Sequence, residues 1–299
     1  MHADAFHIDD HIVRTLIKEQ FPDQSALVLR CLQSNGSDNI IYRLGADMCV
    51  RLPITPRASA MLIKEIECIP KLPSLPLQIP MPLFAGKPVS DYQSPWAIYR
   101  WIDGEAVSDH SIQDELDAAE KLATFIGVLR RADASDAPLY GKHNNFRGCP
   151  LRQRHEPTVA AIENVSDLYS ANDLQSVWER SLNVKEWPDA PVWVHGDIHA
   201  GNLLSREGKL AAVIDFGLMG AGDPAVDLIV NWSLLGASAR SHFRSVLDID
   251  QNTWLRGRGW ALSTALIALA YYRDKHQYLS EMSNRVIREV LTDADLPPI

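Results

Sequence analysis

The sequence predicts an α+β protein of two lobes, a small N-terminal lobe over residues 1–101 and a larger, mainly helical lobe over residues 102–299. Before residue 101, short runs rich in β-branched and aromatic residues alternate with turn residues, a pattern typical of antiparallel strands. After residue 101, apolar residues recur at helical spacing over long stretches, which indicates helices. With 299 residues, the chain is long enough for two lobes that share a cleft.

The N-terminal lobe is predicted to hold a small antiparallel sheet and one helix. The proline content of residues 70–82, which include five prolines, excludes a helix there and favours an extended connection over the surface. The predicted strands cover residues 28–32, 40–44, 48–52, 83–86 and 96–102, and the predicted helix covers residues 57–69.

The C-terminal lobe is predicted to be mainly helical, because apolar positions three and four apart dominate it. Between its helices, residues 192–217 favour two short strands around a turn at Gly208. The predicted helices cover residues 112–131, 152–165, 171–184, 225–235 and 241–247, and residues 253–291 are expected to hold two more.

The composition is that of an ordinary globular protein with an acidic balance. The net charge of −9 repels nucleic acid and anionic membranes and is compatible with a cationic small-molecule partner. The four cysteines lack metal-site or disulfide-framework spacing. The N-terminus carries acids where a signal peptide would be basic and then apolar, and no apolar run approaches the roughly 18 residues that span a bilayer. A cytoplasmic protein, monomeric or homodimeric, is therefore expected.

Three residues between the predicted helices have the pattern of phosphoryl-transfer chemistry. Four residues separate Asp197 from Asn202, which is the spacing of a kinase catalytic loop, and Asp215 follows in an Asp-Phe-Gly sequence. Transfer to a hydroxyl needs a carboxylate beside that hydroxyl and oxygen ligands that hold Mg²⁺ against the phosphates. Asp197 is thus the candidate catalytic base, and Asn202 and Asp215 are the candidate Mg²⁺ ligands.

Two histidines flank Asp197, and a zinc site is the alternative that they raise. His195 and His199 are four positions apart, as in zinc-binding pairs on helices, but Gly196 and Gly201 favour a loop. His195 is therefore expected to brace the loop through hydrogen bonds, and the role of His199 stays open.

Three spaced motifs carry a resemblance to a known family. His-Gly-Asp-Ile-His-Ala-Gly-Asn at residues 195–202, Ile-Asp-Phe-Gly at 214–217 and Gly-Asp-Pro-Ala-Val-Asp-Leu at 222–228 are similar to the aminoglycoside phosphotransferase family, which has the protein-kinase-like fold. The resemblance implies that Asp197 is the base, that Asn202 and Asp215 bind Mg²⁺, and that ATP or GTP is the co-substrate. It also implies that Asp227 braces the catalytic loop; an exposed carboxylate on a helix surface is the alternative.

The resemblance further implies a phosphate site in the N-terminal lobe. The loop with Ser34, Gly36 and Ser37 would offer backbone N–H groups to the phosphates, although its single glycine also suits a plain hairpin turn. Arg51 would contact the phosphates and pair with Glu65 on the following helix. Protein kinases have lysine in place of Arg51, so a mere surface ion pair is the alternative.

The nucleotide base is expected at residues 98–102, where the backbone between the lobes can pair with a purine edge. Tyr99, Arg100 and Trp101 are the candidate contacts, and an ordinary edge strand of the core is the other interpretation. This segment does not distinguish ATP from GTP.

The acceptor site is the least defined part of the prediction. Residues 144–148, Asn-Asn-Phe-Arg-Gly, resemble a segment of some aminoglycoside and macrolide phosphotransferases. Acids between residues 105 and 117 could bind a cationic sugar or could form a solvated helix N-terminus. Aromatic residues of the last third could line a pocket or form core: Trp232, Trp254, Trp260, Tyr271, Tyr272 and Tyr278.

The function predicted from these motifs is transfer of the γ-phosphate of a Mg-nucleoside triphosphate to a small-molecule hydroxyl. An antibiotic acceptor, an aminoglycoside or a macrolide, is the first hypothesis. A housekeeping kinase of a sugar, amino alcohol or amino acid is the second, and a nucleotide-binding pseudokinase is the third. Only four residues separate Gly217 from Gly222, which leaves no room for a long activation segment and favours constitutive activity.

Overall fold

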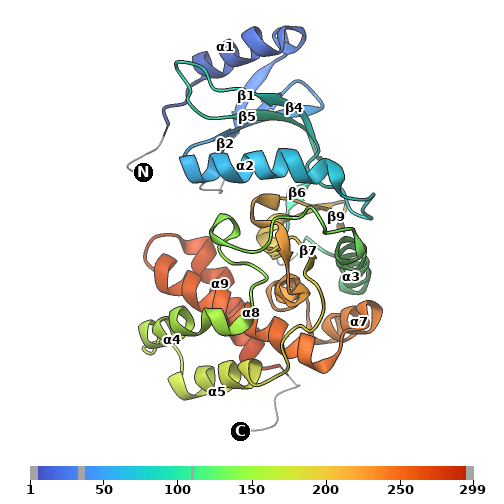
Figure 1. The fold of residues 1–299 in the computed structure, drawn as a ribbon, viewed down its shortest axis with the longest axis vertical. Coiled ribbons are helices and arrows are strands. Elements are labelled where there is room, and N and C mark those ends of the chain that lie inside the picture. The colour runs from blue at the N-terminus through green and yellow to red at the C-terminus, as the bar shows by residue number, and fades with distance from the viewer. Residues whose placement is uncertain (1–5, 33–37, 109–110, 294–299) are drawn as a thin grey trace.

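In the computed structural model, which describes residues 6–32, 38–108 and 111–293, the chain forms two lobes stacked along its long axis (Figure 1). The N-terminal lobe contains a five-stranded sheet in the order β1-β2-β3-β5-β4, and all neighbouring strands are antiparallel. The α+β fold class is thereby confirmed. The strands are β1 (Leu29–Leu32), β2 (Asn39–Leu44), β3 (Met48–Pro53), β4 (Pro82–Gly86) and β5 (Trp96–Arg100).

Helices cover both faces of this sheet. α2 (Pro56–Cys68) begins after Thr55, whose side chain accepts a hydrogen bond from a backbone N–H of the first turn. Its Leu62 packs with Cys49, Ala97 and Tyr99 on one face of the sheet. This arrangement holds α2 between the sheet and the C-terminal lobe (Figure 1).

The prediction of one helix in this lobe is wrong, because α1 (Asp10–Gln20) covers the other face of the sheet. Asp9 caps its N-terminus, and Val13, Leu16 and Ile17 are buried against the strands. The three positions have helical spacing, so the signal is present in the sequence. Burial of this apolar stripe, more than the helix propensity of an 11-residue segment, stabilises α1.

Contrary to the prediction, the proline-rich connection begins in a 3₁₀ helix, Ile69–Lys71, and it does not simply cross the surface. Leu77 is buried in the core cluster of the C-terminal lobe. Gln78 donates its N–H to the carbonyl of Ala211 at 3.1 Å and accepts the N–H of Val213 at 3.0 Å. The connection therefore forms a short parallel bridge with β9 (Lys209–Val213) and joins the two lobes.

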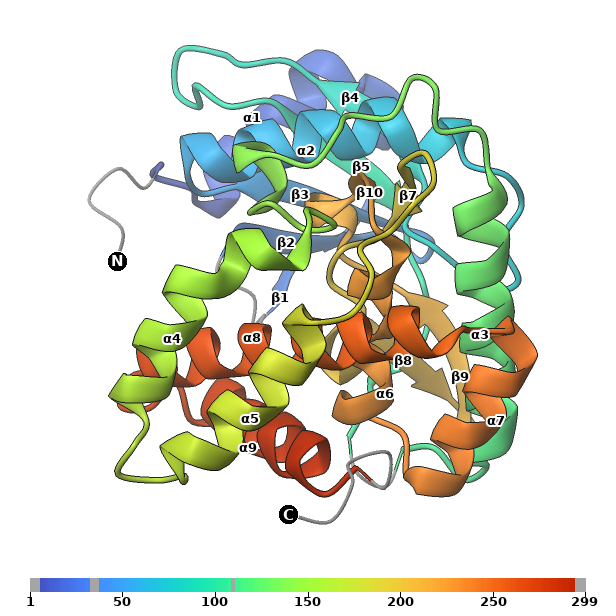
Figure 2. The same ribbon diagram turned by 60° about the horizontal axis from the view of Figure 1, so that its bottom comes forward.

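The C-terminal lobe is built around α8 (Gln251–Tyr272), which contacts α4, α5 and α9 (Figure 2). Residues 225–235, predicted to be one helix, form a 3₁₀ helix, Pro224–Ile229, followed by a single α-turn. The remaining helices are α3 (Glu115–Arg131), α4 (His155–Asn164), α5 (Ala171–Leu182), α6 (Val230–Ser233), α7 (Ala237–Leu247) and α9 (Gln277–Leu291). No described helix is long and apolar enough to cross a membrane.

Short strands beside the lobe junction position the candidate site. β7 (Val192–Val194) pairs with β10 (Gly220–Gly222), and β8 (Leu203–Arg206) pairs with β9 and with β6 (Glu105–Ala106). Residues 195–202 therefore form a loop that leaves one small sheet and enters the other. Both ends of this loop are held by ladder hydrogen bonds.

Candidate active site

The loop between β7 and β8 places Asp197 beside Asn202. The Asn202 side-chain nitrogen donates to the backbone carbonyl of Asp197 at 3.0 Å and to its carboxylate Oδ2 at 3.3 Å. Because these contacts orient the nitrogen of Asn202 towards Asp197, its amide oxygen is the atom left to bind a metal. The structure thus brings together two of the predicted site residues.

Asp227 fixes the start of the loop at residues 195–202 through hydrogen bonds. Its two carboxylate oxygens accept the backbone N–H groups of His195 at 2.9 Å and Gly196 at 2.7 Å. Burial raises the pKa of Asp227 to about 7, and the two N–H donors oppose that rise. Asp227 lies 1% exposed in the 3₁₀ helix Pro224–Ile229, so it is not a helix-surface carboxylate.

His195 lies buried between the loop and the Asp-Phe-Gly segment. Its Nδ1 accepts the N–H of Asp197 at 3.2 Å, and its Nε2 lies 3.2 Å from the carbonyl oxygen of Ile214. The ring also lies 4.4 Å from that of Phe216. Burial lowers the pKa of His195 to about 4, so the ring is neutral at pH 7 and acts through hydrogen bonds.

Asp215 is placed beside Asn202 by a backbone hydrogen bond. Ile214 donates its N–H to the carbonyl of Asn202 at 2.9 Å, and Asp215, which is exposed, has φ of +64°. Positive φ is uncommon for a residue with a side chain and recurs at functional sites. An exposed carboxylate and an amide oxygen are the hard donors that Mg²⁺ prefers, so these residues fit that ion.

On the N-terminal side, Arg51 and Glu65 form a buried ion pair. Arg51 Nη1 lies 2.6 Å from Glu65 Oε2, and the side chains are 12% and 1% exposed. The Tyr99 hydroxyl donates to the same oxygen at 3.0 Å. The pair lines a small hollow with Asp215 and Gly217, so it is not a mere surface ion pair. Ser34, Gly36 and Ser37 lie outside the described residues.

The predicted base-contact residues are already engaged elsewhere. The N–H of Arg100 donates to Met81 at 3.0 Å, and the N–H of Trp101 donates to Asp47 at 2.7 Å. The side chain of Tyr99 turns inward to Glu65. The backbone N–H groups of Arg100 and Trp101 are therefore not free to pair with a purine. The Tyr99 ring does not face the cleft.

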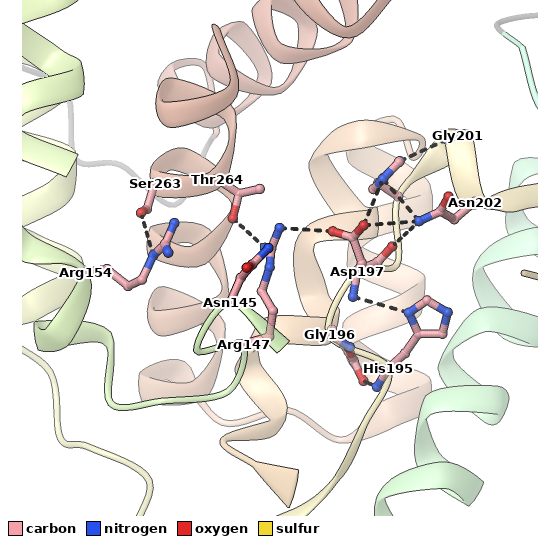
Figure 3. Close-up of polar contacts among 12 residues, drawn as sticks. Asn145, Arg147, Arg154, His195, Gly196, Asp197, Gly201, Asn202, Ser263 and Thr264 are labelled. Atoms are coloured by element: carbon pink, nitrogen blue, oxygen red, sulfur yellow. Dashed lines mark hydrogen bonds and ion pairs between the residues drawn. The ribbon is translucent and has the colours of Figure 1, made fainter. Parts of the chain in front are cut away.

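Arg147 is the site residue whose role the sequence did not define. Its Nη2 donates to Asp197 Oδ1 at 3.0 Å, and its Nη1 donates to Thr264 Oγ1 at 2.8 Å (Figure 3). Burial alone would raise the pKa of Asp197, but Arg147 and then His199 lower it below its ordinary range. The Asn-Asn-Phe-Arg-Gly segment was the available signal, although nothing in its spacing reveals its partner.

The loop that carries Arg147 has an unusual backbone. Asn145, Phe146 and Gly148 have φ of +53°, +58° and +81°. Across from it, Gly196 has φ of +83°, and a Cβ there would lie 3.0 Å from Arg147 Cβ and 2.6 Å from a carbonyl oxygen. Glycine at position 196 is thus required for Arg147 to approach the catalytic loop.

His199 contributes hydrogen bonds within the loop. Its Nδ1 accepts the N–H of Gly201 at 3.1 Å, and its Nε2 lies 3.2 Å from the Asn202 nitrogen and 3.5 Å from Asp197 Oδ2. Within the described residues, no cluster of three histidine, cysteine or acidic side chains has the form of a metal site. His199 therefore orients Asn202 and Asp197.

Three of the candidate acids between residues 105 and 117 have structural partners, and Asp109 lies outside the described residues. Asp114 caps α3, Asp117 pairs with Lys121 at 2.7 Å, and Glu115 accepts the N–H of Gly236. Among the aromatic residues, Trp232, Trp254 and Trp260 are buried core, whereas Tyr271 and Tyr278 are exposed.

The fold and these contacts define a kinase-like phosphotransferase. The sequence model of the phosphotransferase enzyme family (APH) matches residues 32–260, so the chain belongs to that family. The resemblance deduced from the three motifs is thereby confirmed. No curated protein sequence matches the chain.

Several solved structures share the fold. The GDP complex of aminoglycoside 2'-phosphotransferase-IIIa has a TM-score of 0.69 and 19% identity, covering 95% of this chain and 99% of that one. The streptomycin and ATP complex of APH(2'')-IIa has a TM-score of 0.61 and 22% identity, covering 97% and 98%. Macrolide 2'-phosphotransferase MphH from Brachybacterium faecium has a TM-score of 0.62 and 16% identity, covering 93% and 97%.

Proposed function

We propose that the protein transfers the γ-phosphate of a Mg-bound nucleoside triphosphate, ATP or GTP, to a hydroxyl of a small molecule. The observation that carries this proposal is the contact of Asp197 with Asn202, together with the backbone hydrogen bond that joins Ile214, the residue before Asp215, to Asn202. A base and two metal ligands are the groups that phosphoryl transfer needs. Residues 1–101 then bind the nucleotide, and residues 102–299 carry the catalytic loop and the acceptor site.

The nucleotide phosphates are expected in the hollow lined by Arg51, Asp215 and Gly217. Arg51 supplies positive charge to the phosphates, and Glu65 and Tyr99 hold its side chain in place. Asn202 and Asp215 would hold Mg²⁺, which when bound neutralises charge on the phosphate oxygens.

Asp197 binds the acceptor hydroxyl. Because Arg147 and His199 keep the pKa of this carboxylate low despite its burial, Asp197 is ionised at neutral pH and accepts a hydrogen bond from the hydroxyl. It orients the oxygen for attack and takes its proton as the phosphoryl group transfers. A weakly basic carboxylate suits a loose transition state, in which the proton leaves late and positioning supplies most of the rate.

Two classes of acceptor are consistent with the family. The structural neighbours include enzymes named for aminoglycosides and macrolides, so an antibiotic is the first candidate. A sugar, amino alcohol or amino acid hydroxyl is the second. The same base and metal ligands serve either class, so only the acceptor side of the cleft discriminates.

Phosphoryl transfer to a panel of acceptors, measured by mass spectrometry of the product with ATP or GTP, tests the proposal. Asp197→Asn keeps the shape but removes the base, so kcat should fall by roughly 10²–10⁴ while nucleotide affinity stays within a few fold. Omission of Mg²⁺ should abolish transfer. Equal turnover by wild type and Asp197→Asn would contradict the assignment of the base, whereas nucleotide binding without turnover of any acceptor would favour a nucleotide-binding module.

A further inference from the structure

Two arginines meet adjacent residues of α8 on the acceptor side of Asp197. Arg147 Nη1 donates to Thr264 Oγ1 at 2.8 Å, and Arg154 Nε donates to Ser263 Oγ at 3.3 Å. Figure 3 shows Arg147 approaching Asp197 from the side opposite Asn202, with Arg154 beyond it. Since Asn202 is the proposed metal ligand, this pair of guanidinium groups lies on the flank where the acceptor must bind.

The positive charges of Arg147 and Arg154 are only partly compensated by carboxylates. Asp197 contacts Arg147 alone of the two, and within the described part of the chain no ion pair joins Arg154 to a carboxylate. Burial, and after it the positive charge of Arg147, lower the pKa of Arg154 to about 10. Arg154 lies over the ring of Trp260, 5.4 Å from its centroid, which offers only weak compensation.

Hydrogen-bond donors are also left over. The Nε of Arg147 is buried without a partner. The Arg154 side chain donates through Nε alone, and its two terminal nitrogens have no acceptor among the described residues. A desolvated guanidinium without a counter-ion is unfavourable, whereas an oxyanion in its plane gains two short charge-assisted hydrogen bonds.

We propose that Arg147 and Arg154 form a subsite for an oxyanion, a carboxylate or a phosphate, carried by the acceptor. The inference rests on the proposed function and specifies its substrate class: a hydroxyl compound that bears an acid group. Arg147 at the base and Arg154 beyond it repel a polycationic aminoglycoside at this point, since like charges disfavour each other most strongly where water is scarce. The overall charge of −9 does not change this, because local charges dominate a cleft.

The contact of Arg147 with Asp197 is compatible with an acceptor hydroxyl at the same carboxylate. Arg147 bonds only Oδ1, while Oδ2 faces Asn202 and His199. An acid group held by the terminal nitrogens of Arg154, next to the positive charge of Arg147, would fix one end of the acceptor. Its hydroxyl end would then reach the Asp197 carboxylate in a defined orientation.

Matched acceptors test the charge preference directly. Glucuronate, glucose and glucosamine share a pyranose ring and differ mainly in the charge that they carry, and glucose 6-phosphate separates a phosphate from a carboxylate. We expect kcat/KM at least tenfold higher for one of the two anions than for glucose, because a site built for an anion leaves its donors unpaired with a neutral analogue. Higher kcat/KM for glucose or glucosamine than for both anions would overturn the proposal.

A variant of Arg154 separates binding from chemistry. Arg154→Met should raise KM for the preferred anion about tenfold or more and leave kcat/KM for glucose within twofold. Arg152→Met, a change at an exposed neighbour, should leave both unchanged. An equal loss for charged and neutral acceptors in Arg154→Met would overturn the subsite.

A binding test covers the case in which none of these compounds turns over. Roughly 20 mM sodium sulfate, compared with sodium chloride at equal ionic strength, should raise the Tm of the wild type and of Arg152→Met by about 2 °C or more. Arg154→Met, or Arg154→Gln if the first variant does not fold, should lose that rise. A rise in the Arg154 variant equal to the wild type, or no rise in the wild type, would overturn the subsite. Sulfate binding without turnover of any acceptor would support the subsite and count against the phosphotransferase proposal.

Discussion

Two buried arginine–carboxylate pairs flank the proposed catalytic cleft, and they differ in how completely their charges are satisfied. Arg51 and Glu65 lie 2.6 Å apart with side chains 12% and 1% exposed, and Tyr99 adds a third partner. Arg147 and Asp197 lie 3.0 Å apart with side chains 11% and 20% exposed. We call the first pair closed, because both of its charges are buried and bonded. We call the second pair open, because the Asp197 carboxylate is 20% exposed and Arg147 Nε has no partner. In the proposed function, the first pair positions Arg51 for the nucleotide phosphates, and the second leaves the Asp197 carboxylate open to the acceptor.

α2 connects these two pairs. It carries Glu65, and its neighbour Lys64 lies 3.1 Å from His143 Nδ1. Arg57, near the start of α2, donates to Asn145 at 3.3 Å. Both contacts reach the loop that carries Arg147, so a displacement of α2 would disturb the nucleotide side and the acceptor side together.

The largest effect on stability is expected from breaking the closed pair. Glu65→Gln leaves Arg51 buried without a counter-ion, so the free energy of unfolding should fall by about 3–5 kcal/mol. Arg147→Met is the matched change in the open pair, where Asp197 keeps contact with water, Asn202 and His199. Its loss should be only about 1–2 kcal/mol. Urea unfolding measures both, and equal losses would show that the distinction between the pairs is wrong.

A backbone change at Gly196 sharpens the comparison at the open pair. Gly196→Ala must accommodate φ of +83° and a Cβ 2.6 Å from the Leu218 carbonyl oxygen. We expect a loss of about 1–3 kcal/mol in unfolding free energy and a lower kcat, because Arg147 Cβ must also move. Gly141→Ala is the control, since its Cβ would meet atoms no closer than 3.5 Å. A Gly196→Ala protein with wild-type stability and kcat would contradict this account of the loop.

The smallest expected effect on stability comes from Lys64 of α2, which links the two pairs, and it depends on pH. Burial lowers the pKa of Lys64 to about 8, below its ordinary value of 10.5. Between these values the unfolded chain binds more protons than the folded one, so the contribution of Lys64 to stability rises as pH rises from 8 to 10.5. Lys64→Met should remove this upward slope.

The measurement is the free energy of unfolding of wild type minus that of Lys64→Met across this pH range. Using the difference cancels other groups that titrate there, such as Cys49, whose pKa burial raises to about 11. Lys71→Met, at an exposed lysine near the end of the same helix, is the control. A flat difference for Lys64→Met would mean that the lysine is solvated in the folded protein.

Much of the fold followed from local patterns. The alternation of strands and turns in residues 28–52 and the helical spacing in residues 57–69 predicted β1, β2, β3 and α2 within one or two residues. α1 was missed although Val13, Leu16 and Ile17 carry its periodicity. Residues 225–235 were predicted as one helix, but close contacts with α8 and the hydrogen bonds of Asp227 favour a tighter 3₁₀ turn.

The candidate chemistry was accessible from the chain because its residues lie close together in sequence. Asp197, Asn202 and Asp215 fall within nineteen positions. Their spacing indicates one loop followed by a pair of adjacent strands, so local structure is enough to bring them together. Contacts between distant segments have no such signature. Arg147 reaches Asp197 across 50 positions and Thr264 across 117, and only the assembled C-terminal lobe brings these three together. The acceptor side of the cleft is made of such long-range contacts, which is why its charge emerged from the tertiary structure alone.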